Sequence, residues 1–518
     1  MGAVILVEIQ VTSPAGAPGV LRFSDRAIRP FPPTDPDRPN VGFDSRIVEQ
    51  PTVRRALFDN LATMKPSLGV GVLTLANSDG ELDAYEGYVW GEMEVLRWTE
   101  GTDFAAATVI LAGLCAPPSY PRPAGQVRRV TVSLYDYAAE ASKPLQPAAY
   151  AGSNGVGGVL YEGTADGLKG RPKPLAFGNL LDAHLPAPQV NPGVRAHQLH
   201  DGPIEGAEQV FDRGDAAGLV DDGDYAGAAF DGVNPAAAKY RTDIARGLLK
   251  MNATPVGQVT FGCKGDKTGG IYVETAGPII ARLLARSGVD AGRIGASVAG
   301  LAGAAVVGFY ADGTTTLGEA VAFVAAGVPA AVLPDRTGVW QALAYGPPKL
   351  AADATLTEHQ VIACTADEAA PLPVGEIRVG WGRVWRTFSG TDLAPALAAT
   401  ASAERLAAEY RFAVVEDATV KARLPGTWQT VEIATALRAE ADALALANAL
   451  KALLGLRPDG KPRRAWRVTV EIERALASTL GETIAFDFPP YGLSGNFLLV
   501  GEELCSPRRD QAVWTLWG

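Results

Sequence analysis

The stretch Val4-Ile-Leu-Val-Glu-Ile-Gln-Val11 decides how this chain begins to fold, because its apolar residues recur at every second position. In an extended segment Ile5, Val7, Ile9 and Val11 lie on one face, and the residues between them lie on the other. Such alternation is typical of a β-strand with one buried face. The sequence therefore predicts a β-sheet at the start of the chain.

The same alternation returns in three later parts of the chain. The repeats are Val130, Val132 and Leu134; Ile377, Val379 and Trp381; and Val468, Val470 and Ile472. Helical patterns are fewer: apolar residues have helical spacing over 279–284, and Thr316-Leu-Gly-Glu319 is a capping box that predicts the start of a second helix. These patterns predict a multidomain fold that is mainly β with α+β elements.

A hairpin is predicted directly after the second of these helices. The apolar runs Ala330–Pro334 and Val339–Tyr345 flank Asp335-Arg-Thr-Gly338, whose Asp and Gly are residues that turns prefer. The helices and this hairpin together predict a small helix-hairpin domain.

The length of 518 residues is too great for one core and indicates several domains. Frequent Gly (58) and Pro (37) indicate many turns, while 47% hydrophobic residues leave enough apolar material for several cores. Changes in local composition and in the spacing of apolar residues along the chain predict four domains. They are a β domain over 1–147, a turn-rich β domain over 148–268, the small α+β domain over 269–350, and a β domain over 351–518 with a long helix near 433–454.

The charge and the rare residue types exclude several kinds of function. A net charge of −11 argues against a specific nucleic-acid partner. The four Cys are far apart with no CxxC pair, which fits buried thiols rather than a zinc site or a disulfide scaffold. The longest uncharged run, 294–311, is rich in Gly and Ala, so a short helix is favoured over a membrane span.

The motifs of known catalytic sites are incomplete in this sequence. Gly295-Ala-Ser-Val-Ala-Gly300 has its second glycine one place too far for a nucleophile elbow. Gly262-Cys-Lys-Gly-Asp-Lys-Thr268 lacks the upstream glycine and the Gly-Lys pair of a phosphate loop. Both are interpreted as local structure, a helix start and a turn.

Candidate metal and anion sites are equally weak. His197 and His200 form an HxxH pair without a neighbouring Glu or a third ligand. Two acidic stretches, 212–224 and 77–83, resemble calcium loops but match no complete one, and solvated turns explain them more simply. The basic stretch 457–467 is interpreted as a charged hairpin loop. The sequence therefore predicts no catalytic, cofactor-binding or metal-binding residue, no cofactor, and no enzyme.

Three phrases of the sequence resemble baseplate hub and tail tip proteins of long-tailed phages and gene-transfer-agent-like particles. The first is Val72-Leu-Thr-Leu-Ala-Asn-Ser-Asp-Gly-Glu-Leu-Asp83, similar to an L-x-N-x-D-G-x-L-D phrase of their N-terminal domains. The second is spread over 161–178, 201–203 and 242–248, and the third is the C-terminal stretch 499–518. The phrases occur in a consistent order over most of the chain.

This resemblance implies both an architecture and a role. It implies small hub-type β-barrels at the two ends of the chain, over 1–147 and 351–518. It also implies a homotrimeric virion protein that closes the distal tail tube and adapts a six-fold tube to a three-fold tip. The implied partners are distal tail or tube proteins, the tape-measure protein and central tip or fibre proteins, with assembly in the host cytoplasm and a part in genome ejection.

Two other functions stay open on sequence grounds. The many carboxylates leave room for a tail-associated cell-wall hydrolase, since a catalytic pair would meet only in the folded chain. Loops that carry aromatic residues leave room for a carbohydrate-binding tip module. The chain lacks an appended lysozyme or peptidase domain like those of larger hub proteins, which favours the structural role.

Overall fold

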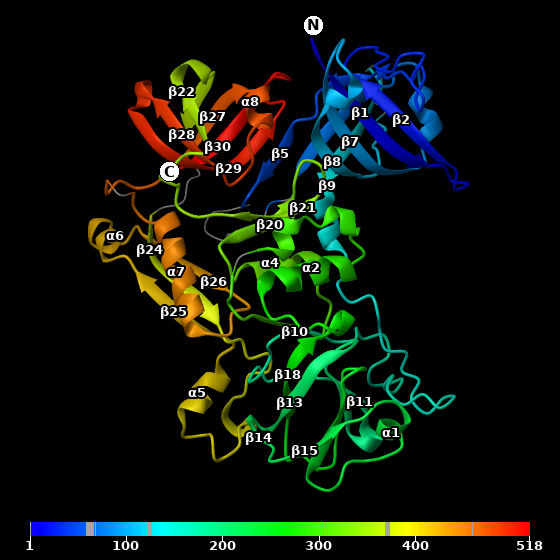
Figure 1. Cartoon of the computed structure of the whole chain (residues 1–518), viewed down its shortest axis with the longest axis vertical. Helices are drawn as coiled ribbons and strands as arrows, with labels where there is room; N and C mark the ends of the chain where they lie inside the picture. The colour runs from blue at the N-terminus through cyan, green and yellow to red at the C-terminus, as the bar shows by residue number, and fades with distance from the viewer. Residues whose placement is uncertain are drawn as a thin grey trace.

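The two ends of the chain lie side by side at one end of the molecule, and the middle of the chain forms the other end (Figure 1). The computed structural model describes residues 2–58, 67, 69–121, 127–301, 303–367, 373–457 and 459–518. The predicted mainly β, multidomain fold is confirmed: strands form several separate sheets, and one large sheet takes strands from both ends of the chain. No helix in these ranges is both long and apolar enough to cross a membrane.

The N-terminal β unit begins with the strand that the opening alternation predicts. Its elements are β1 (Ala3–Thr12), β2 (Pro18–Ser24), β3 (Asp44–Ser45), β4 (Ile47–Glu49), β5 (Val53–Ala56), β6 (Val70–Ala76), η1 (Glu81–Tyr85), β7 (Val89–Thr99), η2 (Phe104–Ala106), β8 (Thr108–Cys115), β9 (Arg129–Asp136) and η3 (Tyr137–Ser142). In β1 the alternate residues Ile5, Val7 and Ile9 are all buried, and they join the largest apolar core of the molecule.

A lower β unit follows and has its own core. Its elements are β10 (Leu175–Gly178), β11 (Gln189–Asn191), η4 (Pro192–Val194), β12 (Ala196–Gln198), β13 (Ile204–Asp212), β14 (Asp215–Ala216), β15 (Val220–Asp224), α1 (Ala228–Asp231), β16 (Lys239–Asp243), β17 (Leu248–Met251), β18 (Val259–Asp266) and η5 (Thr268–Gly270). Leu185, Leu249 and Phe261 lie in the middle of this second core.

A middle unit of helices and a hairpin connects the lower unit to the top of the molecule. Its elements are α2 (Ala276–Arg286), η6 (Ala291–Arg293), α3 (Ala296–Ala299), β19 (Gly308–Ala311), α4 (Leu317–Ala325), β20 (Ala330–Pro334) and β21 (Trp340–Ala344). The predicted capping box at Thr316 and Glu319 is confirmed by its two reciprocal hydrogen bonds. The predicted hairpin is confirmed as well, with Pro334 paired to Trp340 around the turn.

The rest of the chain forms a three-stranded unit and a C-terminal β unit. In order, the elements are β22 (Ala354–Thr357), η7 (Glu358–Gln360), β23 (Ala363–Ala366), β24 (Val374–Trp381), η8 (Gly390–Asp392), α5 (Ala401–Ala407), β25 (Arg411–Glu416), α6 (Ala418–Arg423), β26 (Gln429–Ala434), α7 (Glu440–Leu454), β27 (Ala465–Glu471), α8 (Ile472–Leu476), β28 (Thr483–Phe488), η9 (Pro489–Tyr491), β29 (Leu493–Leu504) and β30 (Gln511–Trp517). The three-stranded unit is β24–β26 with α6 and α7.

The helix predicted near 433–454 begins later, at Glu440. Residues 429–434 instead form β26, which pairs in parallel with β24. The reason lies in the pattern of this stretch, because Val431 and Ile433 are buried while the residues beside them are exposed. Alternate burial on a sheet satisfies these β-branched residues better than a helix does.

The predicted barrels are corrected by the strand pairing. Within the described ranges the large sheet follows an open path and forms no closed barrel. The sheet comes closest to closing into a barrel at residues 44–49, where β3 pairs with β2 and β4 pairs with β6. These two short strands are separated at Arg46. The sheet also continues past the N-terminal unit, because β5 pairs with β29 and joins the two end units edge to edge.

The two end units repeat one arrangement of strands. In the N-terminal unit the strands β6, β7, β8 and β9 follow one another along the chain, with η1 between the first two, and they lie in the order β6-β9-β8-β7 in the sheet. In the C-terminal unit the strands β27, β28, β29 and β30 follow one another along the chain, with α8 between the first two. They lie in the matching order β27-β30-β29-β28 in the sheet. All six pairings are antiparallel. Each end of the chain therefore contributes a four-stranded sheet of the same connectivity.

Candidate functional site

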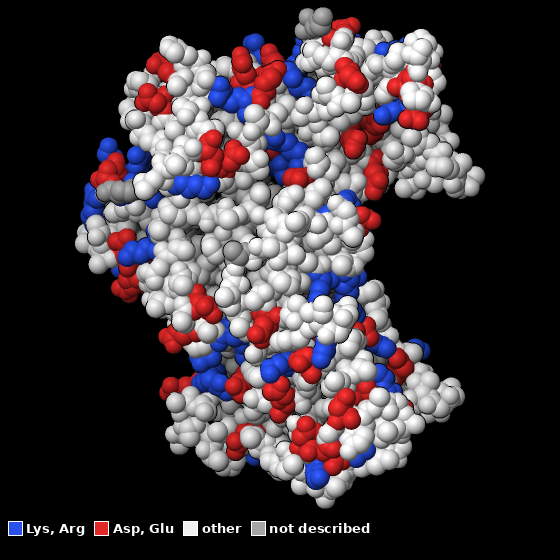
Figure 2. Space-filling model, viewed as in Figure 1, with Lys and Arg blue, Asp and Glu red and all other residues white. Residues whose placement is uncertain are grey.

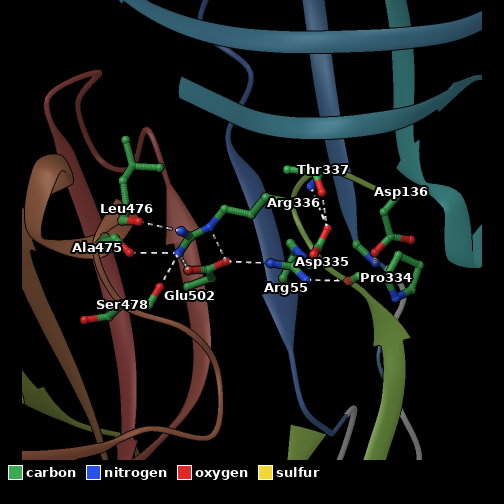
Figure 3. Close-up of polar contacts among 11 residues, drawn as sticks. Arg55, Asp136, Pro334, Asp335, Arg336, Thr337, Ala475, Leu476, Ser478 and Glu502 are labelled. Carbon is green, nitrogen blue, oxygen red and sulfur yellow. Dashed lines mark hydrogen bonds and ion pairs between the residues drawn. The ribbon is translucent and has the colours of Figure 1, made fainter. Parts of the chain in front are cut away.

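A buried polar site lies where the two end units meet the middle unit. It is formed by Arg55, Arg336 and Glu502, which we call the central junction (Figure 3). Arg55 comes from β5, Glu502 from β29, and Arg336 from the turn of the β20–β21 hairpin. Arg55 and Glu502 stand opposite each other in the pairing of their strands.

Glu502 is bonded to both arginines of the junction. Its Oε1 accepts hydrogen bonds from Arg55 Nη1 at 3.0 Å and from Arg336 Nε at 3.1 Å, and its Oε2 accepts one from Arg336 Nη2. The Glu502 side chain is fully buried and that of Arg55 is 5% exposed. Because the site is largely shielded from water, the buried carboxylate to which both cations are bonded is a strong charge partner for them.

Arg336 also binds the C-terminal end of α8. Its Nη1 donates to the Leu476 carbonyl at 3.0 Å, and its Nη2 donates to the carbonyls of Ala475 at 2.8 Å and Ser478 at 3.0 Å. The last carbonyls of a helix carry partial negative charge and lack partners within the helix, so a cation is favourable there. The carbonyl of Arg336 itself accepts a hydrogen bond from the amide of Ala112 in β8, at 2.8 Å. One turn residue thus contacts both end units.

The turn that presents Arg336 is held in shape by Asp335. Its Oδ1 accepts hydrogen bonds from the Thr337 amide at 2.9 Å, the Thr337 hydroxyl at 2.6 Å and the Val339 amide at 3.1 Å. This is the bonding that makes Asp a preferred turn residue. Arg55 Nη2 donates to the carbonyl of Pro334 at the end of β20, so the hairpin is fixed on both sides.

A second buried carboxyl, Asp136, lies next to the junction at the end of β9. It accepts hydrogen bonds from the amides of Gly69 and Ala138, each at 3.0 Å. Burial raises the pKa of Asp136 to about 6, against the opposing attraction of Arg55. The carboxyl groups of Asp136 and Glu502 both accept hydrogen bonds from other parts of the chain. This geometry suits a structural contact between units and not an acid–base pair that faces a substrate.

A cavity beside the β20–β21 hairpin offers no acid–base pair either. It has a volume of about 720 Å³ and lies between α4, the β20–β21 hairpin and β26, with walls made mainly of alanine and larger apolar side chains. Two carboxylates line it. Glu319 is held in the capping box of α4, and Glu432 is paired with Arg378 at 3.2 Å. This wall favours apolar contact rather than hydrolysis.

The two histidines of the HxxH pair have separate partners. His197 Nδ1 donates to the Ala187 carbonyl at 3.1 Å. His200 Nδ1 accepts from the Ala176 amide at 2.9 Å, and its Nε2 lies 3.4 Å from Asp266 Oδ1. Among the described residues no group of three or more His, Cys, Asp or Glu side chains is placed to hold a metal ion.

The two acidic stretches are bonded within the chain. Asp222 pairs with Lys239 at 3.1 Å and with Arg241 at 2.5 Å, and Asp212 accepts the amides of Val256 and Gly257. In the other stretch, Asp79, Glu81 and Asp83 are ion-paired with Arg46 or Arg128. Asp222 lies in β15 and not in the solvated turn that the sequence suggested, and the carboxylate oxygens of both stretches bond to other parts of the chain.

The remaining motifs fall on ordinary elements. Gly262–Thr268 runs from β18 into η5, Gly295–Gly300 contains the short helix α3, and in the basic stretch Arg467 pairs with Glu503 at 2.9 Å. Sequence reasoning missed the central junction. The one feature of the sequence that falls on the junction is the predicted turn at Asp335–Gly338, and a turn does not indicate which distant residues Arg336 contacts.

The chain is similar to phage tail proteins of known structure, as its sequence phrases predict. The 43 kDa tail protein of prophage MuSo2 from Shewanella oneidensis is matched over 98% of both chains, at 9% identity and a TM-score of 0.41. A tail protein from Neisseria meningitidis is matched over 99% of this chain and 96% of its own, at 10% identity and a TM-score of 0.38. Prophage tail protein gp18 from Listeria monocytogenes is matched over 99% and 94%, at 10% identity and a TM-score of 0.32. The sequence itself matches no protein-family model and no curated protein.

Proposed function

We propose that this chain is a structural protein of a phage-type tail, a baseplate or tail-tip hub that closes the distal end of the tube. The observation that carries the proposal is the repeated strand order of the two end units. They lie side by side at one end of the molecule and are joined through β5 and β29 (Figure 1).

This repeat suits an adaptor between two symmetries. A three-fold oligomer of a chain with two similar units places six similar units around its axis, and a closed ring of that kind is compatible with a six-fold partner. The central junction supports the arrangement, because the side chain of Arg336 bonds to the C-terminal unit and its backbone carbonyl accepts a hydrogen bond from the N-terminal unit. In this proposal the ring faces the tube, and the lower β unit is free to contact tip or fibre proteins.

The acidic charge of the chain suits a passage for DNA. A net charge of −11 disfavours retention of phosphate as a genome moves through the ring. The proposed partners are the tube protein, the tape-measure protein and the central tip or fibre proteins, and the proposed location is the tail tip of the virion.

The proposal is tested by stoichiometry and by imaging. Native mass spectrometry of the purified full chain is expected to give a trimer, and averaged images are expected to show six lobes at one end of a three-fold particle. Gold labelling of a tagged chain in intact particles is expected to mark the tail tip. A monomer at micromolar concentration, together with labelling elsewhere or nowhere on the particle, would refute the hub.

A further inference from the structure

A group of arginines lies at the opposite end of the three-stranded unit from the central junction, where that unit meets the lower β unit. We call Arg405, Arg411 and Arg438 the arginine cluster. They come from α5, from the start of β25 and from the segment before α7. Figure 2 shows Lys and Arg side chains gathered at this level of the molecule, on the side of the three-stranded unit.

The backbone brings the segments of the cluster together. The amide of Phe388 donates to the carbonyl of Leu406, next to Arg405, at 2.8 Å. The amide of Gly382 donates to the carbonyl of Leu437, next to Arg438, at 2.8 Å. Residues 382–388 therefore connect the three arginines.

Arg411 is held in place by stacking. Its guanidinium carbon lies 3.6 Å from the ring centroid of Trp381, and its Nε is buried without an acceptor within the described ranges. The neighbouring Gly382 has φ +62°, and a Cβ there would come within 2.5 Å of Arg411 Nη2. The site thus has room for a flat guanidinium and for little else.

Arg438 is fixed from the other side of the same loop. Its Nη1 donates to the carbonyl of Arg383 at 3.2 Å, and its Nη2 donates to the carbonyl of Leu181. Both acceptors are neutral carbonyls, so these bonds position the guanidinium without cancelling its charge. Arg405 is half-buried on α5 and has no hydrogen-bond or ion-pair partner among the residues described.

Around Arg411 and Arg438, the positive charges of the cluster outnumber the carboxylates that attract these two side chains. Burial, together with Arg411 and Arg405, lowers the pKa of Arg438 to about 10, and Asp182 acts in the opposite direction. The other opposing carboxylate is Glu440, which is exposed and attracts Arg411. Asp182 is itself shared, since its Oδ1 accepts a hydrogen bond from Gln209 at 3.1 Å.

We propose that the arginine cluster is an oxyanion-binding site, at which Arg405 and Arg411 donate hydrogen bonds to a carboxylate or phosphate group and Arg438 adds positive charge nearby. A guanidinium presents its N–H groups in a planar fork that matches the two oxygens of such a group. Two of these forks have no acceptor within the described part of the chain, and at least one is already locked in orientation by stacking, so little side-chain freedom is lost on binding. This inference goes beyond the hub role and does not depend on it.

The test is calorimetric titration of the full chain with two probes at constant ionic strength. The probes are inorganic phosphate and an acetylated, amidated triglutamate peptide. Saturable binding of at least one probe is expected, weakened about tenfold or more in the double variant Arg405→Gln with Arg411→Gln. The matched control, Arg29→Gln with Arg508→Gln, removes the same charge from two exposed arginines and is expected to bind like the wild type.

A third variant moves the affinity in the opposite direction. Asp182 has φ +54°, a backbone conformation that Asn tolerates, so Asp182→Asn removes one opposing charge and keeps the oxygen that Gln209 binds. This variant is expected to bind the probe about threefold more tightly. Binding of the peptide alone would assign the site to an acidic protein segment, and binding of phosphate alone would assign it to a phosphate source.

Three results would overturn the proposal: no saturable binding of either probe, equal affinity in the double variant and the wild type, or weaker binding by Asp182→Asn. If the double variant does not fold, the affinity of Asp182→Asn for the probe tests the proposal: tighter binding supports it and weaker binding overturns it. None of these results bears on the trimer or on its location, so failure here and failure of the hub proposal are distinguishable.

Discussion

The molecule contains two groups of arginines that have opposite relations to their surroundings. In the central junction, two arginines share the fully buried carboxylate of Glu502, and Arg336 also binds the end of a helix. In the arginine cluster, three arginines are collected around one loop and the carboxylates nearby are shared or exposed. Arginine side chains join units of the fold where a buried carboxylate is bonded to them. They remain open to a ligand where the nearby carboxylates are shared or exposed.

The largest effect is expected from removing the acid of the junction. Glu502→Gln leaves two cations of the junction without their charge partner, and we expect a loss of about 3–5 kcal/mol in the free energy of unfolding. Denaturant unfolding measures it. The control is Glu432→Gln, which breaks the half-exposed pair with Arg378 and is expected to cost under about 1 kcal/mol. Equal losses in the two variants would mean that the junction is no stronger than a surface ion pair.

Acid is expected to weaken the region beside the arginine cluster. His184 is fully buried, and burial with the nearby Arg405 lowers its pKa to about 4. The unfolded chain takes up this proton from pH 6.5 downward while the folded chain does not, so stability is lost between pH 6.5 and 4, by up to about 3 kcal/mol.

Unfolding at a series of pH values checks this loss. His184→Asn is expected to be less stable at pH 7 but to lose less stability on acidification, and Asn is suited to the φ of +51° at this position. The exposed His359 provides the control, since His359→Asn is expected to keep the wild-type pH dependence. An unchanged acid slope in His184→Asn would show that this imidazole is not the group responsible.

A smaller effect is expected from the second arginine of the junction. Arg336→Met removes the bonds to Glu502 and to the end of α8 but leaves Arg55 paired, so we expect a loss of about 2–3 kcal/mol. Hydrogen exchange is expected to rise at the end of α8 and at the amide of Ala112. Protection that stays at the wild-type level at both places would show that the hairpin turn does not connect the two end units energetically.

The smallest effect is expected at the arginine cluster itself. Arg405→Gln removes a cation that has no bonded partner in the described ranges and that repels Arg438. The free energy of unfolding is therefore expected to change by less than about 0.5 kcal/mol, or to rise slightly. Thermal and denaturant unfolding measure it, and a loss of about 2 kcal/mol would reveal a fastening like the central junction.

Local features of the fold were predictable because their causes lie within a few residues. The capping box at Thr316, the turn at Asp335 and the alternation in β1 each depend on neighbours in the sequence. The pairing of β5 with β29 was not predictable, since nothing in the sequence of residues 53–56 or 501–504 indicates that these two segments pair. For the same reason the ends were expected as separate barrels, and the open shared sheet was missed.

Neither group of arginines was visible in the sequence. Arg55, Arg336 and Glu502 are dispersed over most of the chain, and nothing in their local patterns indicates burial. The net charge of −11 pointed away from a positive site, because a sum over the chain does not show how charges group in space. Only folding places Arg405, Arg411 and Arg438 around residues 382–388.

The β5–β29 ladder has a consequence for synthesis on the ribosome. The edge of β5 that faces β29 stays unpaired until residue 504 has been made, so the N-terminal unit waits for nearly the whole chain before its sheet is complete. A chain cut short before β29 would keep an open strand edge, which favours aggregation over ordered assembly. An intact β29 is therefore needed for the N-terminal sheet to have its full set of paired strands.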